Sequence, residues 1–512
     1  MPPPPVPPIV PPSELDEQAL VVHAATQAVL PALNTTYYFD QLIDHNNASL
    51  GTFKQRYWTT WNYYETGGPI ILFTPGELNA ETFTGYLTNR TINGQMAQQH
   101  NGATIVLEHR FYGQSNPLPD LSVESFQYHT IHQAVEDIEY FAKNVKLPMP
   151  GGDQVAPGQA PWIMVGGSYS GVLTAYTMEK KPGLFQAGYA SSAPVQNIFN
   201  FWRYFEPIRE GMPKNCSNDV QAALAAFDST VSNATAFKAL QDQFGMGAVT
   251  HQDDVTGALR INLWTWQELN PSDGPGTKFF KFCDALEVDK DGAIAPEAGF
   301  GAEHALAAWA AYFKNTTLPN YCGNVDAETC LGSYDGTLDY WTNTSVDNAG
   351  RSWSWIVCNE VGFLQDTAPD DQPSLVSRIV TVAGDQRQCQ LMFPKAFPTP
   401  PVAKVDVTNA AYGGWNISVD RLFFANAQRD PWRDATVSAE GLTPSGTPAE
   451  NIGVSDAFHC SDLLTRNTVD ATVLAVQQKG LAQVKKWVAE WQPTAAKREL
   501  APARVGVVSK DA

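Results

Sequence analysis

Ser168, Asp430 and His459 have the residue types and order of a nucleophilic catalytic triad. Ser168 lies in Gly166–Gly167–Ser168–Tyr169–Ser170–Gly171, after a short apolar run and before a helix-forming stretch. A serine on a sharp strand-to-helix turn needs small neighbours and is presented with backbone N–H groups around it. The usual pattern has glycine two residues after the nucleophile, whereas Ser170 takes that place here.

The acid and the base follow late in the chain. Asp430 comes shortly after an apolar run at 422–426, and His459 precedes the last helical pattern. By itself, an aspartate before proline is usually a turn residue, and a lone histidine is usually structural. The order serine, acid, histidine is nevertheless that of α/β-hydrolases. We therefore predict that His459 takes the Ser168 proton while Asp430 orients the imidazole.

The negatively charged oxygen of a tetrahedral intermediate needs two N–H donors. The backbone of Tyr169, the residue after the nucleophile, is the first predicted donor. The second is predicted in the loop at Gly76–Glu77, with Gly76 preferred, or in the turn after Glu108.

The elements that must position these residues are indicated by apolar runs. Runs of buried-strand length alternate with helical patterns up to about residue 190, which predicts a mainly parallel sheet covered on both faces. From residue 196 the patterns are helical. The predicted strands are 52–58, 70–74, 103–108, 162–166, 186–190 and 422–426, and the predicted helices outside 196–410 are 131–145, 172–181 and 471–491.

These patterns predict an α/β-hydrolase fold with a large, mainly helical cap, stapled by disulfides and inserted between nucleophile and acid. The hydrolase domain is expected in two parts, 37–195 and 411–492, with the cap at 196–410. The proline-rich residues 1–36 are interpreted as a mobile arm or the remnant of a pro-segment, and 493–512 as a disordered tail.

The composition of the 512-residue chain excludes several functions. It has 53 acidic and 33 basic residues, a formal charge of −20, which argues against nucleic acid and anionic membrane surfaces as partners. No apolar run reaches the length of a membrane span. The seven cysteines contain no C-x-x-C pair, so we expect no metal and no cofactor.

The cysteines and glycosylation motifs favour an exported protein. Six cysteines could pair, with Cys358–Cys389 the preferred bridge and Cys460 the free one. We expect a secreted protein, with the lysosome or vacuole as the alternative, although Met1 leads into prolines rather than a signal peptide. The Asn-x-Ser/Thr sites are Asn34, Asn47, Asn89, Asn215, Asn233, Asn315, Asn343 and Asn416.

Further stretches form a distinctive set of motifs. They are Phe53–Lys54–Gln55–Arg56–Tyr57–Trp58, Glu108–His109–Arg110–Phe111–Tyr112–Gly113, Trp353–Ser354–Trp355, Asp430–Pro431–Trp432 and Phe458–His459–Cys460–Ser461–Asp462–Leu463. With the serine motif, they closely resemble the serine peptidases that cleave after proline. This family includes lysosomal Pro-Xaa carboxypeptidase, dipeptidyl peptidase II and the fungal secreted prolyl endopeptidases, and the fungal branch looks most similar.

The resemblance implies hydrolysis on the carboxyl side of proline, or of alanine as a second choice, at acidic pH through an acyl-enzyme on Ser168. Trp432 is expected to line the proline pocket, because a flat indole packs well on a pyrrolidine ring. The other substrate-binding candidates are Val172, Trp355 with its neighbour Trp353, and Glu77 and Glu360 as ligands of a substrate amino terminus.

Several alternatives remain open at this point. The peptidase could be an endopeptidase acting on proline-rich proteins, or an exopeptidase of the same family. An esterase or lipase would use the same triad, but the indole of Trp432 suits a proline ring better than an acyl chain. A non-catalytic binding glycoprotein is the third alternative, and the presence of all three triad residues argues against it. The chain is expected to be a monomer or a homodimer.

Overall fold

A central sheet of eight strands organises the computed structural model, which describes residues 8 and 20–493. The strand order is β1-β2-β4-β3-β5-β6-β9-β10. β1 and β4 pair antiparallel with β2, and the other neighbours are parallel. The strands are β1 (Tyr37–Leu42), β2 (Thr52–Thr60), β3 (Ile70–Phe73), β4 (Ala103–Leu107), β5 (Trp162–Gly167), β6 (Ala187–Ser191), β9 (Leu422–Ala427) and β10 (Ile452–Ser455).

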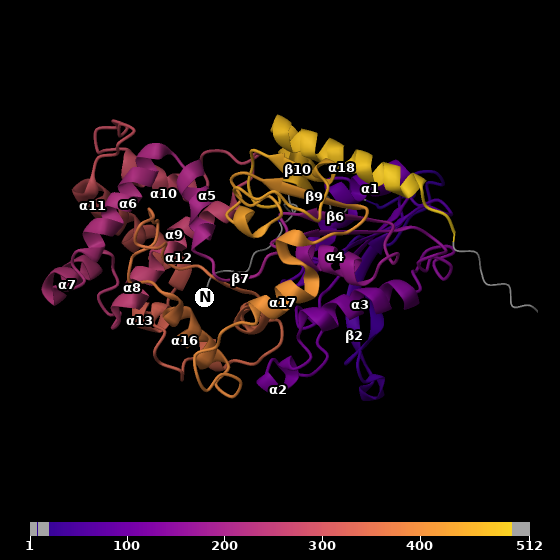
Figure 1. Ribbon diagram of the computed structural model, residues 1–512, viewed down its shortest axis with the longest axis horizontal. Helices are drawn as coiled ribbons and strands as arrows, with labels where there is room; N and C mark the ends of the chain where they lie inside the picture. Colours follow the sequence, from indigo (N-terminus) through magenta and orange to yellow (C-terminus); the bar gives the residue numbers. More distant parts are fainter. Residues whose placement is uncertain (1–7, 9–19, 494–512) are drawn as a thin grey trace, which may run out of the picture.

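Helices cover both faces of this sheet. α1 (Ile92–His100) and α18 (Ala471–Ala489) lie on one face, and α3 (Ile131–Asn144) and α4 (Tyr169–Lys180) lie on the other (Figure 1). The central strands are apolar and buried throughout, as expected for parallel strands covered on both sides. The structure therefore has the predicted α/β-hydrolase fold.

The predicted strands and helices of this domain are all present, but the two edge strands of the sheet were not predicted. β1 and β10 are the two edge strands, and each is only partly buried, so neither has the continuous apolar run of the central strands. α4 begins at Tyr169 rather than at about residue 172. The helix therefore starts directly after the nucleophile.

A helical insertion connects β6 to β9 and forms the left-hand lobe of Figure 1. It also contains a small parallel sheet that the helical patterns did not predict, made by β7 (Ile198–Asn200) and β8 (Gly362–Leu364). Its helices are α5 (Glu206–Gly211), α6 (Lys214–Asp228), α7 (Ala234–Gln243), α8 (Gln252–Ala258), α9 (Arg260–Trp264), α10 (Lys278–Glu287), α11 (Ala302–Tyr312), α12 (Leu318–Cys322), α13 (Ala327–Leu331), α14 (Asp339–Thr342), α15 (Ala349–Ile356), α16 (Val382–Met392) and α17 (Val405–Tyr412).

Three disulfides staple the insertion: Cys216–Cys283, Cys322–Cys330 and Cys358–Cys389. The predicted Cys358–Cys389 bridge is confirmed, and Cys460 is the free, buried cysteine as predicted. A bridge such as Cys216–Cys283, which closes a long loop, restricts the unfolded chain strongly. The disulfides therefore hold together helices that do not belong to the sheet.

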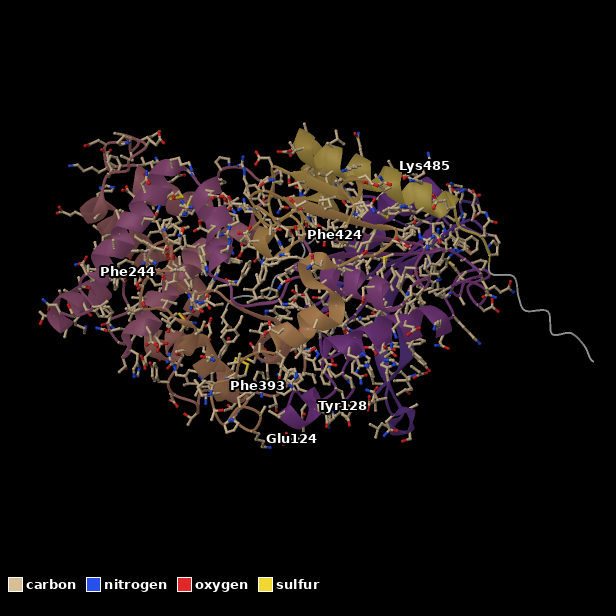
Figure 2. All side chains as sticks on the ribbon, viewed as in Figure 1. Glu124, Tyr128, Phe244, Phe393, Phe424 and Lys485 are labelled. Atoms are coloured by element: carbon tan, nitrogen blue, oxygen red, sulfur yellow. A yellow bond between two sulfur atoms is a disulfide. The ribbon has the colours of Figure 1, made fainter. Side chains whose placement is uncertain are left out.

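One hydrophobic cluster runs through both parts of the molecule. It extends from Phe244 and Phe393 in the insertion to Phe424 in β9 (Figure 2). A second cluster, under α1 and α18, fills the other face of the sheet. The insertion is thus packed against the sheet domain through a shared core, which fixes the site between them.

The segment interpreted as a mobile arm or the remnant of a pro-segment includes residues 20–36, and this described part forms hydrogen bonds to the sheet domain. The ring of His23 donates to the carbonyl of Tyr64 at 2.8 Å, and the Ala24 N–H donates to the carbonyl of Asn62 at 2.7 Å. Apart from Pro8, residues 1–19 lie outside the described residues, as does the predicted disordered tail beyond residue 493. No described helix combines the length and apolar character needed to cross a membrane.

Candidate active site

Ser168 lies at a strained turn between β5 and α4. Its φ is +60° and its ψ is −129°, a conformation that costs energy for a residue with a side chain. The turn is crowded, because a Cβ on Gly166 would come within 2.0 Å of the Ser170 carbonyl oxygen. The Ser170 hydroxyl accepts the Gly167 N–H at 2.9 Å and donates to the Gly167 carbonyl at 2.8 Å. The serine that replaces the usual glycine therefore braces the turn.

The structure brings Ser168, His459 and Asp430 together. His459 Nε2 lies 2.8 Å from Ser168 Oγ, and its Nδ1 lies 2.8 Å from Asp430 Oδ1. A carboxylate only accepts, so Nδ1–H donates to Asp430 and the lone pair of Nε2 faces the serine hydroxyl. Asp430 Oδ1 also accepts the Trp432 N–H at 2.9 Å, which fixes the carboxylate. This is the geometry of a serine nucleophile activated by a general base.

The loop that carries His459 is anchored to β6. The carboxylate of Asp462 accepts hydrogen bonds from the Tyr189 hydroxyl at 2.8 Å and the Ser191 hydroxyl at 2.7 Å. The Cys460 N–H donates to Ser192 Oγ at 2.9 Å. Because Ser191 also pairs through its carbonyl with the Ser168 N–H at 2.9 Å, one strand end positions both the base and the nucleophile.

The loop after β3 lies beside the start of α4, as predicted for part of an oxyanion hole. A Cβ on Gly76 would lie 3.2 Å from the Tyr169 ring and 3.3 Å from the Ser170 nitrogen. Tyr169 is the first residue of α4, so its N–H is one of the free donors of a helix start. The Gly76 N–H instead donates to Thr74 Oγ1 at 3.3 Å. Gly76 can serve as the second oxyanion donor only if its N–H gives up the bond to Thr74 and turns to the substrate oxygen. The sequence did not predict this competing bond.

Trp432 lies at the centre of an aromatic cluster beside the catalytic imidazole. Its ring centroid is 5.6 Å from Phe201, 5.5 Å from Tyr204, 5.1 Å from Phe363 and 6.3 Å from His459. The three phenyl and phenol rings come from the insertion and were not predicted. The aromatic run Phe201–Trp202–Arg203–Tyr204–Phe205, at the start of the insertion, is the signal that could have identified two of them.

Gln267 is a further residue that the sequence did not single out. Its Oε1 accepts the Trp432 indole N–H at 2.7 Å and the Tyr204 hydroxyl at 3.1 Å. The amide lies in the 3₁₀ helix Thr265–Glu268, η5, directly after α9. It therefore fixes the rotation of the indole from the insertion side.

The other predicted substrate-binding residues lie at different distances from the nucleophile. Val172 lies one turn into α4, with its N–H donating to the Ser168 carbonyl at 3.0 Å. Trp355 packs on Phe126 and Phe393, at 5.4 and 5.2 Å between centroids, so it belongs to the core between the two parts. Trp353, with its ring 5.4 Å from Tyr169, is the indole that reaches the neighbourhood of the nucleophile.

Glu77 is buried and Glu360 is half-buried, and both lie close enough to influence Tyr169. Their contacts differ. No hydrogen-bond partner for either oxygen of Glu77 exists in the described part of the chain. Burial raises the pKa of Glu77 well above its usual value, and the nearby charge of His459 lowers it only in part. Glu360 accepts the Ile131 N–H at the start of α3 at 3.2 Å, and burial raises the pKa of Glu360 to about 7. Both are therefore proton-carrying groups at acidic pH.

Opposing effects act on the histidines around the site. Burial lowers the pKa of His459, but the charge and hydrogen bond of Asp430, together with the neighbouring Cys460, outweigh it, so the pKa of His459 lies well above the usual value. Burial lowers the pKa of His109, which bonds to the Tyr169 hydroxyl at 3.3 Å, to about 4. The buried imidazole of His109 is thus neutral when that of His459 still binds a proton.

Two other distinctive motifs build the structure that surrounds the site. Glu108 is fully buried and forms a two-point ion pair with Arg56, at 2.7 and 2.9 Å. Arg110 Nε donates to Asp137 at 2.6 Å, and His45 bonds to the same carboxylate at 2.7 Å. These pairs tie β2, the turn after β4 and α3 together, and buried pairs of this kind are costly to break.

Comparison with known proteins identifies the family of this chain. Residues 41–481 match the family described as serine carboxypeptidase S28. A serine protease vicPa from Bipolaris victoriae is 33% identical over 474 residues, covering 88% of each chain. A probable extracellular serine carboxypeptidase from Arthroderma benhamiae is 32% identical over 434 residues, covering 80% of this chain and 59% of that protein.

More distant similarity extends to human and bacterial proteins. The human lysosomal Pro-X carboxypeptidase is 24% identical over 498 residues, covering 92% of each chain. Among solved structures, a proline iminopeptidase from Mycobacterium smegmatis aligns over 87% of this chain and 99% of that one, at 10% identity and a TM-score of 0.34. On the match to the family, which spans the whole two-part fold and the triad, the chain belongs to the serine carboxypeptidase S28 family and is a serine peptidase.

Proposed function

We propose that this peptidase cleaves peptide bonds on the carboxyl side of proline. The observation that carries the proposal is the position of Trp432, beside His459 and enclosed by Phe201, Tyr204 and Phe363. Rigid, flat aromatic walls favour a compact, rigid ring, because the contact area is large and little side-chain entropy is lost. Proline is the residue at P1 that meets this description.

In the proposed reaction, Ser168 Oγ attacks the carbonyl carbon of the scissile bond while its proton passes to His459 Nε2. The negative oxygen that forms is stabilised by the Tyr169 N–H and by a donor of the loop at Gly76–Glu77. Protonated His459 then gives its proton to the leaving amine, and the acyl-enzyme forms on Ser168. Water attacks the ester in the second half, with His459 again taking and returning the proton.

The proposed pH range follows from groups that act in opposite directions. Neutral His459 is the base, so its raised pKa sets the acidic limit of activity. Glu77 and Glu360 have raised pKa values and are neutral at acidic pH, and the ionisation of Glu77 would place an unpaired charge near the nucleophile. We therefore propose a bell-shaped profile, with the acidic limb set by protonation of His459 and the alkaline limb by ionisation of these carboxyl groups. The acidic activity that the family resemblance implies is opposed by the raised pKa of His459.

Secretion, or delivery to an acidic vacuole-like compartment, is part of the proposal. Three disulfides are typical of proteins that fold in an oxidising compartment. The side chains of Asn34, Asn47, Asn89, Asn233, Asn315 and Asn416 are exposed, whereas those of Asn215 and Asn343 are half-buried. We propose the exposed sites as the ones that can accept a glycan.

Chromogenic peptides that differ only at P1 test the proposal directly. We expect release from a proline substrate to exceed release from alanine, and both to exceed leucine, across about pH 4 to 7. Ser168→Ala is the control, and it should abolish all three signals. Equal rates for the three peptides would contradict proline specificity, and activity on nitrophenyl esters alone would favour an esterase. Sizing the fragments of a digested proline-rich protein separates endopeptidase from exopeptidase action.

A further inference from the structure

A cavity lies inside the helical insertion. It has a volume of about 590 Å³ and is bounded by α8, α9, α12, α14 and α16. Among the described residues that line it there is no member of the triad. A volume of several hundred cubic ångströms is in the usual range of a ligand site, so this cavity is large enough for a few amino-acid residues.

Aromatic rings form much of the cavity wall. They belong to Trp264, Tyr321, Tyr340 and Trp341, and the side chains of Tyr321 and Tyr340 are 55% and 57% exposed. Exposed rings on one wall are the feature with which proteins bind proline-rich segments, because such segments form a stiff extended helix and lose little entropy on docking.

A buried carboxylate with an unused oxygen lies in the same wall. Asp385 lines the cavity and is 1% exposed, and its Oδ2 has no hydrogen-bond partner among the described residues. Arg260 is the nearest cation, but one of its terminal nitrogens lies 3.9 Å from Asp385 and donates to the Gln365 carbonyl at 2.7 Å. The carboxylate is therefore only partly compensated, which is costly in a buried site.

The surrounding charges are acidic in excess. The described residues of the lining include four aspartates, Asp253, Asp254, Asp339 and Asp385, but only two arginines. Arg387 pairs with Asp253 at 2.6 Å and lies 3.6 Å from Asp254. Arg260 lies 3.9 Å from Asp385. The described residues contain no cluster of three or more His, Cys, Asp or Glu side chains arranged to hold a metal ion. An organic cation, such as an ammonium or guanidinium group, is the ligand chemistry that this wall complements.

The cavity shares a wall with the aromatic cluster of the catalytic site. Trp264 lines the cavity and donates its indole N–H to Gln365 at 2.7 Å. Gln267, three residues further on, accepts the indole N–H of Trp432 at 2.7 Å. Trp264 and Gln267 belong to consecutive helical turns, the end of α9 and η5, so one short segment contributes to both the cavity wall and the aromatic cluster.

We propose that this cavity is a distal subsite for the substrate polypeptide, and that it takes a proline-containing segment with a lysine or arginine side chain. The proposal rests on the proposed function, since it assumes a peptide in the catalytic site. The aromatic rings hold the stiff backbone, and the cationic side chain reaches the free oxygen of Asp385. The enzyme then favours long, basic, proline-rich polypeptides over short peptides.

Binding of this cationic side chain is coupled to the loss of a proton from a nearby carboxyl group. Burial, and after it the charge of Asp385, raises the pKa of Asp366, which lies behind the wall, to about 7, and Arg260 opposes this shift. Burial also raises the pKa of Asp254 on α8. A bound ammonium or guanidinium group beside Asp385 favours the ionised form of the neighbouring Asp366, so affinity should rise as the pH increases from about 5 to 7.5.

The binding test uses the full-length Ser168→Ala chain and labelled ten-residue proline-rich peptides with one central lysine, norleucine or glutamate. Fluorescence anisotropy should rank lysine above norleucine above glutamate, with roughly a tenfold difference in Kd between lysine and norleucine, as expected for one charge-assisted bond. Asp385→Asn should remove this preference, and Tyr340→Ala should weaken all three peptides. Tyr38→Ala, on the exposed face of β1 (61% exposed), is the matched control and should change none.

Kinetics separates this inference from the proposed function. In the active enzyme, Asp385→Asn should raise KM for the lysine decapeptide several-fold while kcat/KM for a short chromogenic proline peptide stays constant. If both substrates change equally, or if neither changes, the subsite does not exist. If the lysine decapeptide binds with the predicted dependence on Asp385 but no proline peptide is cleaved, the proposed function fails and the binding site stands.

Discussion

The indole of Trp432 packs beside the imidazole of His459, with 6.3 Å between the ring centroids. The same residue donates its backbone N–H to Asp430 Oδ1, the oxygen that also binds His459. The wall of the proposed proline pocket and the catalytic acid are therefore two residues apart on one turn. A P1 side chain that contacts this indole lies next to the base, so binding and chemistry are joined in one short segment.

Trp432→Ala should therefore reduce selectivity for proline much more than it reduces reactivity. Removing the indole face deletes roughly 2–3 kcal/mol of contact with the pyrrolidine ring, so kcat/KM for a proline substrate should fall roughly 30- to 100-fold. The value for alanine at P1 should fall far less. Steady-state kinetics with both substrates checks this, and Trp491→Ala, just past α18, is the control. An equal loss for both substrates would mean that Trp432 acts on the triad alone.

Ser168→Ala should lower kcat by about 10⁴- to 10⁶-fold without unfolding the protein. Asp430→Asn should cost about 10⁴-fold, by the comparison with the same substitution in a known serine protease. Because the triad acts as a unit, Asp430→Asn should add little in a chain that already lacks the Ser168 hydroxyl. Rates of the single and double variants test this, and additive losses would show that the residues act independently.

The triad could be predicted because each member has a local sequence signal and the chain order is restrictive. The aromatic cluster around Trp432 could not, since Phe201 and Phe363 come from segments of the insertion that are far apart in sequence and are brought together at the small β7–β8 sheet. The direction of the Gly76 N–H depends on a 3.3 Å bond to Thr74, and sequence does not specify such loop geometry.

The fold was predictable because most of its elements, like the triad residues, have a local sequence signal. The buried central strands have continuous apolar runs, whereas the edge strands β1 and β10 are half-covered and carry mixed residues. Trp355 shows a related limit, because a buried indole in the core and one in a substrate site have the same sequence signature. Only the contacts with Phe126 and Phe393 distinguish them.

The anchoring of the His459 loop predicts a positioning role for Asp462. Asp462→Asn keeps the size of the side chain but weakens its bonds to the Tyr189 and Ser191 hydroxyls. We expect kcat to fall roughly tenfold, about the loss of one charge-assisted bond, with little change in KM. The pH profile should also move, because burial raises the pKa of Asp462 to about 6. A change in KM alone would contradict the role, and Asp456→Asn on the exposed side of the same loop is the control.

A buried carboxyl pair in the insertion predicts that the protein loses stability as the pH rises. Asp219 accepts the N–H groups of Phe300 and Gly301 at 2.8 Å each, and the adjacent Glu287 has no donor for either oxygen among the described residues. Burial, with the charge of Asp219, raises the pKa of Glu287 to about 7. The folded state therefore holds a proton that the unfolded chain releases near its ordinary pKa of about 4.5.

Glu287→Gln should remove this pH dependence, because the amide supplies at every pH the donor that the protonated acid supplies only below about pH 7. Between the unfolded and folded pKa values, folding binds a proton, so the free energy of unfolding falls as the pH rises. The variant should gain roughly 2–4 °C in Tm at about pH 7.5 and change little at about pH 4.5. Thermal unfolding at both pH values measures the difference, with Glu303→Gln at an exposed position of α11 as the control. An equal shift at the two pH values would show that Glu287 does not carry the proton.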